Sequence, residues 1–194
     1  MTNEKSRHTR HSWATRALHM LLALAVIWQL LTSLAMEGRR AGVPGDWVFS
    51  AHSLAGRVTL GIIVLFWLNL LVRRIGVAPG ALFPWLSAPR RTALYADARR
   101  QVDALRRFRA PQHIDGAALA SAVHGLGLLL VTVMAATGAL WWLLQPSAAA
   151  SFLIDVHTLF GNLAWVYLIG HAGLAILYHL RGEAPLGTMW SGMY

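Results

Sequence analysis

Long apolar runs separated by short polar stretches account for most of the chain. Four of these runs contain no Asp, Glu, Lys or Arg, or almost none, and they predict helices at about residues 13–36, 48–73, 117–144 and 151–181. Each run can cross a bilayer, because a transmembrane helix needs about 20 predominantly apolar residues. A span must also be helical, since the hydrocarbon core offers its backbone no water to hydrogen-bond. The pattern predicts an all-α membrane protein: one domain over residues 1–194, built as a bundle of four transmembrane helices.

The first apolar run follows a basic stretch, as the apolar region of a signal peptide does. Residues 17–36 carry no charge, and this run is longer than the roughly 7–15 apolar residues of a signal peptide. We therefore expect a transmembrane helix that is retained.

Basic residues predict how the bundle is oriented. Lys and Arg are concentrated in the tail before the first helix and in the long loop between the second and third helices, whereas the loop between the third and fourth has none. Cytoplasmic loops are the ones that carry such an excess. We expect both termini and the long basic loop to be cytoplasmic. The net charge of +9 then reflects contact with membrane lipid and not with nucleic acid.

Within the long loop, residues 90–108 place a few apolar positions among Arg and Asp and predict a further helix. Two roles for it are open. A basic helix of this kind can lie on anionic lipid headgroups, which is the simpler interpretation, or it can be a docking surface for a cytoplasmic partner. We identify no internal repeat.

Histidines are the residues that add chemistry to this picture. The chain has nine histidines and no cysteine. The absence of cysteine excludes disulfides, thiolate metal sites and the covalent attachment of a c-type haem. An ionisable residue inside a membrane span is costly and by default indicates a functional site. Six histidines fall in or at the edges of the predicted spans: His19, His52, His124, His157, His171 and His179.

His157 and His171 lie 14 residues apart on the fourth span. In a helix this separation is about 21 Å along the axis and nearly four whole turns, so both rings share one face. Such a geometry suits two stacked sites, one in each leaflet. The direction of each helix predicts the partners. We expect His52 to pair with His157 in the outer leaflet and His19 with His171 in the inner leaflet, with His124 as the alternative to His19.

Two imidazoles that face each other across a helical bundle are the axial ligands expected of a low-spin b-type haem. A haem is flat and broad, so the face beside each ligand needs small side chains, and position i+4 lies on that face. All four of these positions are Gly or Ala: Ala23, Gly56, Gly161 and Ala175. Close packing of membrane helices is the other explanation for small residues there.

Arg57 interrupts the second span five residues after His52. A buried arginine needs an anion, and a haem propionate is one candidate. The alternative is that the side chain extends to the outer surface of the membrane. Both interpretations are open.

Several short motifs resemble those of the bacterial cytochrome b561 family and of its relative, the cytochrome b subunit of nickel–iron hydrogenases. The sequence R-A-L-H, which ends at His19, resembles the opening of the family's first helix, and H-S-L-A-G, which begins at His52, resembles the start of its second. Thr137-Gly138 resembles a Thr-Gly motif of the third helix in the hydrogenase-type branch. The spacing of 14 residues between His157 and His171 is also similar to that of the two histidines on the family's fourth helix. The resemblance covers nearly all of the chain.

The resemblance implies a multi-pass protein of the bacterial cytoplasmic (inner) membrane. It implies two non-covalently bound haem b groups and quinone as a substrate, with a dehydrogenase subunit or a c-type cytochrome as the protein partner. The histidines that match the family's ligands are His19, His52, His157 and His171.

Three functions are consistent with these features. The first is a di-haem b-type cytochrome that carries electrons within the membrane between quinone and a redox partner. The second is a stand-alone superoxide:quinone oxidoreductase, because Arg39 and Arg40 in an outer loop can attract an anion. The third is a haem-free membrane anchor or transporter whose histidines are structural. Whether the protein is an enzyme in its own right is left open.

Overall fold

The computed structural model describes residues 12–38, 43–73, 76–114 and 116–183. The regular elements in these ranges are helices: α1 (Trp13–Ala35), α2 (Trp47–Val72), η1 (Pro79–Ala81), η2 (Pro84–Leu86), α3 (Ala88–Arg106), α4 (Ala118–Leu143) and α5 (Ala148–Leu180). Helices α1, α2, α4 and α5 are each long and apolar enough to cross a membrane. The four predicted spans are therefore confirmed, and the further helix predicted in the long loop is α3.

The spans carry large apolar side chains on their outer surfaces as well as between one another. Leu24, Leu68 and Val166, for example, are exposed on three different helices. A helix on the surface of a water-soluble protein would place polar residues there. Apolar outer surfaces are expected where lipid is the solvent. The chain is a multi-pass membrane protein whose helices contact lipid.

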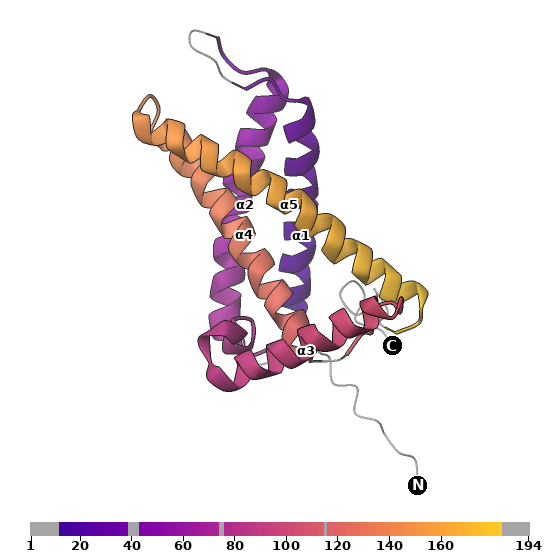
Figure 1. Cartoon of the computed structure of the whole chain (residues 1–194). Coiled ribbons are helices and arrows are strands. Elements are labelled where there is room, and N and C mark those ends of the chain that lie inside the picture. Colours follow the sequence, from indigo (N-terminus) through magenta and orange to yellow (C-terminus); the bar gives the residue numbers. More distant parts are fainter. Residues whose placement is uncertain (1–11, 39–42, 74–75, 115, 184–194) are drawn as a thin grey trace.

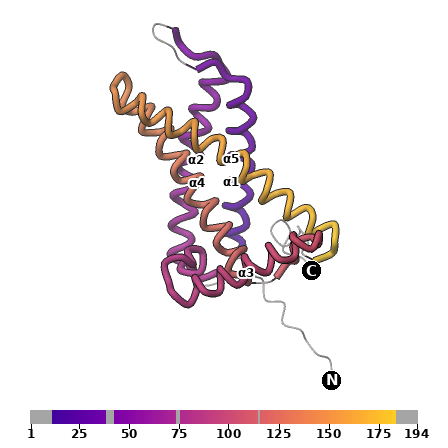
Figure 2. Tube along the Cα trace, in the orientation of Figure 1, coloured from indigo at the N-terminus to yellow at the C-terminus, as the bar shows by residue number. Residues whose placement is uncertain are grey.

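Two helical hairpins make up the bundle (Figure 1). One is formed by α1 and α2, and the other by α4 and α5; they meet chiefly where α2 packs on α4. Helix α5 crosses the bundle obliquely, and α3 lies across the end at which α1 begins and α5 ends (Figure 2). We call the half of the bundle near α3 the proximal half and the other the distal half. The side of the membrane that each half faces stays a prediction.

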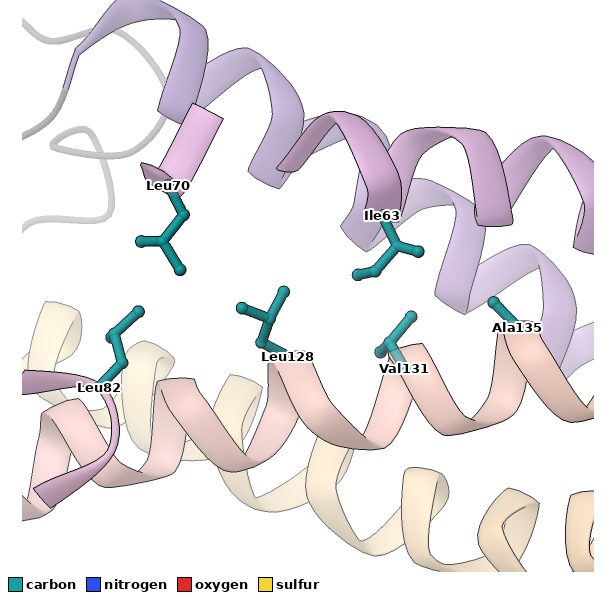
Figure 3. Close-up of a cluster of buried hydrophobic side chains, with 6 residues drawn as sticks. All are labelled: Ile63, Leu70, Leu82, Leu128, Val131 and Ala135. Carbon is teal, nitrogen blue, oxygen red and sulfur yellow. The ribbon is translucent and has the colours of Figure 1, made fainter. Parts of the chain in front are cut away.

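The buried apolar core lies between α2 and α4 (Figure 3). Ile63 and Leu70 of α2 face α4 there. Leu82, from the segment between η1 and η2, closes the proximal end of this core. The backbone of Leu82 reaches α4 at Gly125, where any Cβ would collide with the Leu82 carbonyl. The remaining members of the core are Leu128, Val131 and Ala135.

Three of the four spans begin with a capping side chain from the residue just before the helix. Ser12 accepts a hydrogen bond from Thr15 N, and Asp46 and Ser147 do the same for α2 and α5. Such caps satisfy backbone donors that the first helical turn leaves free. Helix α4 has no side-chain cap of its own. Instead, Asp97 of α3 accepts a hydrogen bond from Leu119 N at 3.3 Å, so that α3 caps α4.

Candidate functional site

In the distal half, His52 of α2 and His157 of α5 are brought together. Their ring centres lie 6.3 Å apart and the ring planes are 85° from each other. With metal–nitrogen bonds of about 2 Å, two imidazoles that bind one metal ion from opposite sides have ring centres about 6 Å apart. These are the two histidines predicted to form the outer pair, and at this separation both rings could hold the iron of one haem.

A threonine on the neighbouring helix holds the His52 ring. His52 Nδ1 lies 3.0 Å from Thr32 Oγ1 on α1. The single hydroxyl proton of Thr32 is donated to the Trp28 carbonyl at 2.8 Å. Thr32 Oγ1 is therefore the acceptor and His52 Nδ1–H the donor. In the neutral imidazole this leaves Nε2 unprotonated, which is the form that binds a metal.

His157 is held in the same way by α4. Its Nδ1 lies 3.1 Å from Thr137 Oγ1 and 3.1 Å from the Met134 carbonyl oxygen. Because a carbonyl oxygen only accepts, Nδ1 must carry the proton. The Thr137 hydroxyl donates to the Val133 carbonyl at 2.7 Å. Nε2 of His157 is thus also left free for a metal.

The space for the His157 ring depends on Gly138. A Cβ at Gly138 would lie 3.1 Å from Cε1 of His157, closer than side chains normally pack. Thr137-Gly138 therefore has a physical role: the threonine bonds the ring and the glycine leaves room for it. The sequence showed this pair only as a motif, and it did not single out Thr32 at all. Neither threonine is near its histidine in the sequence, so only a search for hydroxyl residues across helices would have indicated them.

In the proximal half, His171 of α5 contacts two rings. The His124 ring on α4 lies 5.3 Å from it at 80°, and Tyr167 stacks on it at 5.3 Å and 8°. The hydroxyl of Tyr167 occupies the space that a Cβ on Gly127 would take. The structure thus places the alternative ligand, His124, beside His171. His19 is half-buried on the proximal half of α1, and its pairing with His171 stays a prediction.

Arg57 is fixed between α2 and α4. It donates a hydrogen bond to Ser53 Oγ at 3.0 Å, and its guanidinium lies 4.8 Å over the ring of Trp142. A cation over an aromatic face is a favourable contact. These two contacts hold the charge about one helical turn from His52. Whether the charge serves a propionate stays a prediction.

The small residues after the predicted ligands are half-buried at all four positions. At two of them a neighbouring helix already comes close. A Cβ on Gly56 would lie 3.0 Å from Gln29 Nε2, and a Cβ on Gly161 would lie 3.7 Å from Met134 Cε. Close helix packing therefore accounts for Gly56 directly. Within the described residues, groups of three or more His, Cys, Asp or Glu side chains that could hold a metal ion are absent. The histidine rings of the distal and proximal halves meet in pairs, an arrangement that would suit a haem held by two histidines.

A comparison with protein families matches residues 10–192 of this chain to the prokaryotic cytochrome b561 family. Comparisons with curated proteins and with solved structures gave no match. The match covers nearly the whole chain, including all four spans and every histidine of the two pairs. The chain therefore belongs to the prokaryotic cytochrome b561 family and is a membrane b-type cytochrome of electron transfer.

Proposed function

We propose that this cytochrome binds two haem b groups and carries electrons within the membrane between quinone and a redox partner. The observation that carries the proposal is the distal pair. His52 and His157 come from different hairpins, their rings are 6.3 Å apart, and a threonine on a neighbouring helix bonds Nδ1 of each. Rings held in this way with Nε2 free suit axial ligation of a single iron.

A second haem is held in the proximal half by His171. The helical rise of about 21 Å between His157 and His171 puts the two haems in different leaflets. His19 is the second proximal ligand, with His124 as the alternative. Arg57 binds a propionate of the distal haem, supported by its fixed position one turn from His52.

Haem supplies one-electron chemistry, and the residues of the chain supply ligation, burial and spacing. Quinone in the surrounding lipid is the membrane-side reactant. A dehydrogenase subunit or a c-type cytochrome is the partner at the other end, and the bacterial cytoplasmic membrane is the location. Membership of a cytochrome family argues against a haem-free anchor or transporter. Arg39 and Arg40, on which the superoxide alternative depended, lie outside the described residues.

Visible spectra of the purified protein test this proposal. We expect b-type bands on reduction and two haems per chain by pyridine haemochrome assay. His52→Ala and His157→Ala should each lose the same single haem, whereas His179→Ala, at the exposed end of α5, should keep both. A protein without b-type bands, or with one haem per chain, would contradict the di-haem proposal. Two measurements distinguish the electron carrier from the superoxide:quinone oxidoreductase. One is oxidation of added quinol by the protein, and the other is reduction of the protein by superoxide.

A further inference from the structure

One separation recurs among the polar residues of the two hairpins. Residues of the first hairpin have counterparts of the same type 105 positions later in the second. Three pairs share this separation: His19 and His124, Thr32 and Thr137, and His52 and His157. The spacing holds without a gap, although the loops that join the helices of the two hairpins differ in sequence.

The structure repeats the contacts as well as the residues. Thr32 Oγ1 lies 2.8 and 3.1 Å from the carbonyls four and three residues before it, and 3.0 Å from Nδ1 of His52. Thr137 makes the same three contacts, with its carbonyls at 2.7 and 3.2 Å and His157 Nδ1 at 3.1 Å. Each donor and acceptor of these three contacts in one hairpin has its counterpart 105 residues away in the other.

The glycines one turn after the distal histidines show the same separation of 105 residues. Gly56 and Gly161 are 105 residues apart. The side chain nearest to a Cβ on Gly56 is Gln29, and the one nearest to a Cβ on Gly161 is Met134. Gln29 and Met134 are themselves 105 residues apart. At this point the first helix of each hairpin therefore packs on the second through equivalent positions.

The first helices of the two hairpins begin in register. Helix α1 begins at Trp13 and α4 at Ala118, again 105 residues apart, and both run from the proximal to the distal end (Figure 1). Repeats that run in the same direction are related by an axis along the membrane normal. Matching Leu or Ala positions carry little weight, because any two apolar helices share them. Matched hydrogen bonds to matched histidines do not arise from apolar composition.

We infer that α1–α2 and α4–α5 are two copies of one helical hairpin, and that Thr32 and Thr137 are equivalent positioning residues for the two ligands of one haem. The inference rests on the proposed function, since it assigns His52 and His157 to the same iron. Each threonine accepts the Nδ1–H bond of its histidine, which fixes the tautomer and the orientation of the ring. Such a bond also makes the ligand more basic, and a more basic ligand favours the oxidised haem.

The experiment is a redox titration of the full-length protein in detergent, with Thr32→Val, Thr137→Val and the double variant. We expect each single variant to raise the midpoint potential of the same haem and to weaken retention of that haem about tenfold, the low end of what such supporting bonds contribute. The double variant should show roughly the sum of the two effects, because the two threonines lie on different helices. Thr32→Ser and Thr137→Ser keep the hydroxyl and should restore the wild-type potential.

Thr59→Val is the matched control. Thr59 is a buried threonine of α2 whose hydroxyl donates a hydrogen bond to the Ala55 carbonyl at 2.8 Å. Loss of this hydroxyl should leave the midpoint potentials of both haems unchanged. If the valine variants do not assemble, Thr32→Cys and Thr137→Cys keep the size of the side chain with a weaker hydrogen-bonding sulfur. They should shift the potential in the same direction by less.

Two results would overturn the inference while leaving the proposed function intact. One is that the valine variants affect different haems, or shift one haem in opposite directions. The other is that the serine variants behave like the valine variants, which would show that bulk and not the hydroxyl matters. Loss of different haems in His52→Ala and His157→Ala would overturn both the inference and the ligand assignment on which it rests.

Discussion

At the scale of single residues, groups on a neighbouring helix determine which ring nitrogen of each distal histidine carries the proton. His52 and His157 each donate from Nδ1 to a threonine oxygen whose own proton is already bound to a backbone carbonyl. A neutral imidazole inside a membrane is far less costly than a charged one. Burial therefore favours the neutral form, and the two bonds place its proton on Nδ1 and leave Nε2 available.

Gly138 gives a prediction about the room around His157. Gly138→Ala should move the His157 ring by a few tenths of an ångström, at a cost of about 1 kcal/mol for an off-rotamer side chain. We expect haem retention at the distal site to fall about fivefold, measured by haem content after dilution or competition with apomyoglobin.

The control for this prediction is Gly170→Ala on α5. A Cβ at Gly170 meets nothing within 4 Å, so this variant should retain haem normally. Equal losses in the two variants would mean that helix rigidity, and not contact with His157, controls retention.

Arg57 gives a prediction about charge. If its guanidinium binds a haem propionate, Arg57→Gln removes a positive charge that stabilises the reduced haem. The midpoint potential of the distal haem should then fall, by an amount on the order of 1 kcal/mol for a partly screened charge. Redox titration at two salt concentrations checks this.

Trp142→Leu removes the ring under Arg57 but keeps the charge, and it should change the potential less than Arg57→Gln does. An unchanged potential in Arg57→Gln would instead support the interpretation that the side chain extends to the membrane surface.

At the scale of elements, α3 stabilises the bundle through one carboxylate. Asp97 is buried, accepts from the first turn of α4 and pairs with Arg100. A negative charge at the start of a helix is favourable because the backbone donors there are free. The basic residues of α3 lie mainly on its exposed surface. Contact with lipid headgroups and contact with a protein partner both stay open for that surface.

Loss of this cap should loosen α3 from α4. Asp97→Ala should destabilise the protein by about 1–2 kcal/mol, as loss of a helix cap does. We expect a lower unfolding temperature in detergent and faster proteolysis within residues 88–106.

Asp103→Ala is the matched change on the same helix. Asp103 is half-exposed and pairs with the largely exposed Arg106 at 4.0 Å, and exposed ion pairs contribute little. This variant should unfold close to wild type. If it were as destabilising as Asp97→Ala, loss of helix charge and not loss of the cap would be the cause.

At the scale of the whole molecule, the two-hairpin arrangement bears on the proximal ligands. The counterpart of His19 is His124, and the counterpart of His171 is Phe66, 105 residues earlier. Phe66 packs against the apolar core between α2 and α4. The arrangement thus offers two equivalent proximal positions. The one between α1 and α5 has two histidines, whereas the one between α2 and α4 has one histidine and a phenylalanine.

This asymmetry favours His19 as the partner of His171, although the His124 ring lies beside His171 in the structure. We expect His19→Ala to lose the proximal haem and His124→Ala to keep both, as measured by haem content and by the spectrum of the reduced protein. Loss of a haem from His124→Ala, with both kept in His19→Ala, would assign His124 as the ligand.

Much of the fold was predictable because membrane insertion depends on local composition. The four spans and α3 follow from runs of apolar residues and from charge, which are properties of short segments. The cap of α4 by Asp97 was not predictable, since the two residues are on different helices and Asp97 looks like any charged residue of a basic loop. The equivalence of the two hairpins was also hidden, because apolar residues substitute for one another in lipid and leave few positions to compare.

The sequence by itself determined that this is a four-span membrane protein, and it identified the histidines that we propose as haem ligands. Lipid selects apolar segments one at a time, and a histidine within such a segment is conspicuous. Only the tertiary structure decided which rings meet, which threonines hold them and that both hairpins use the same contacts. These depend on the rotation and crossing of whole helices, which no short segment of the chain specifies.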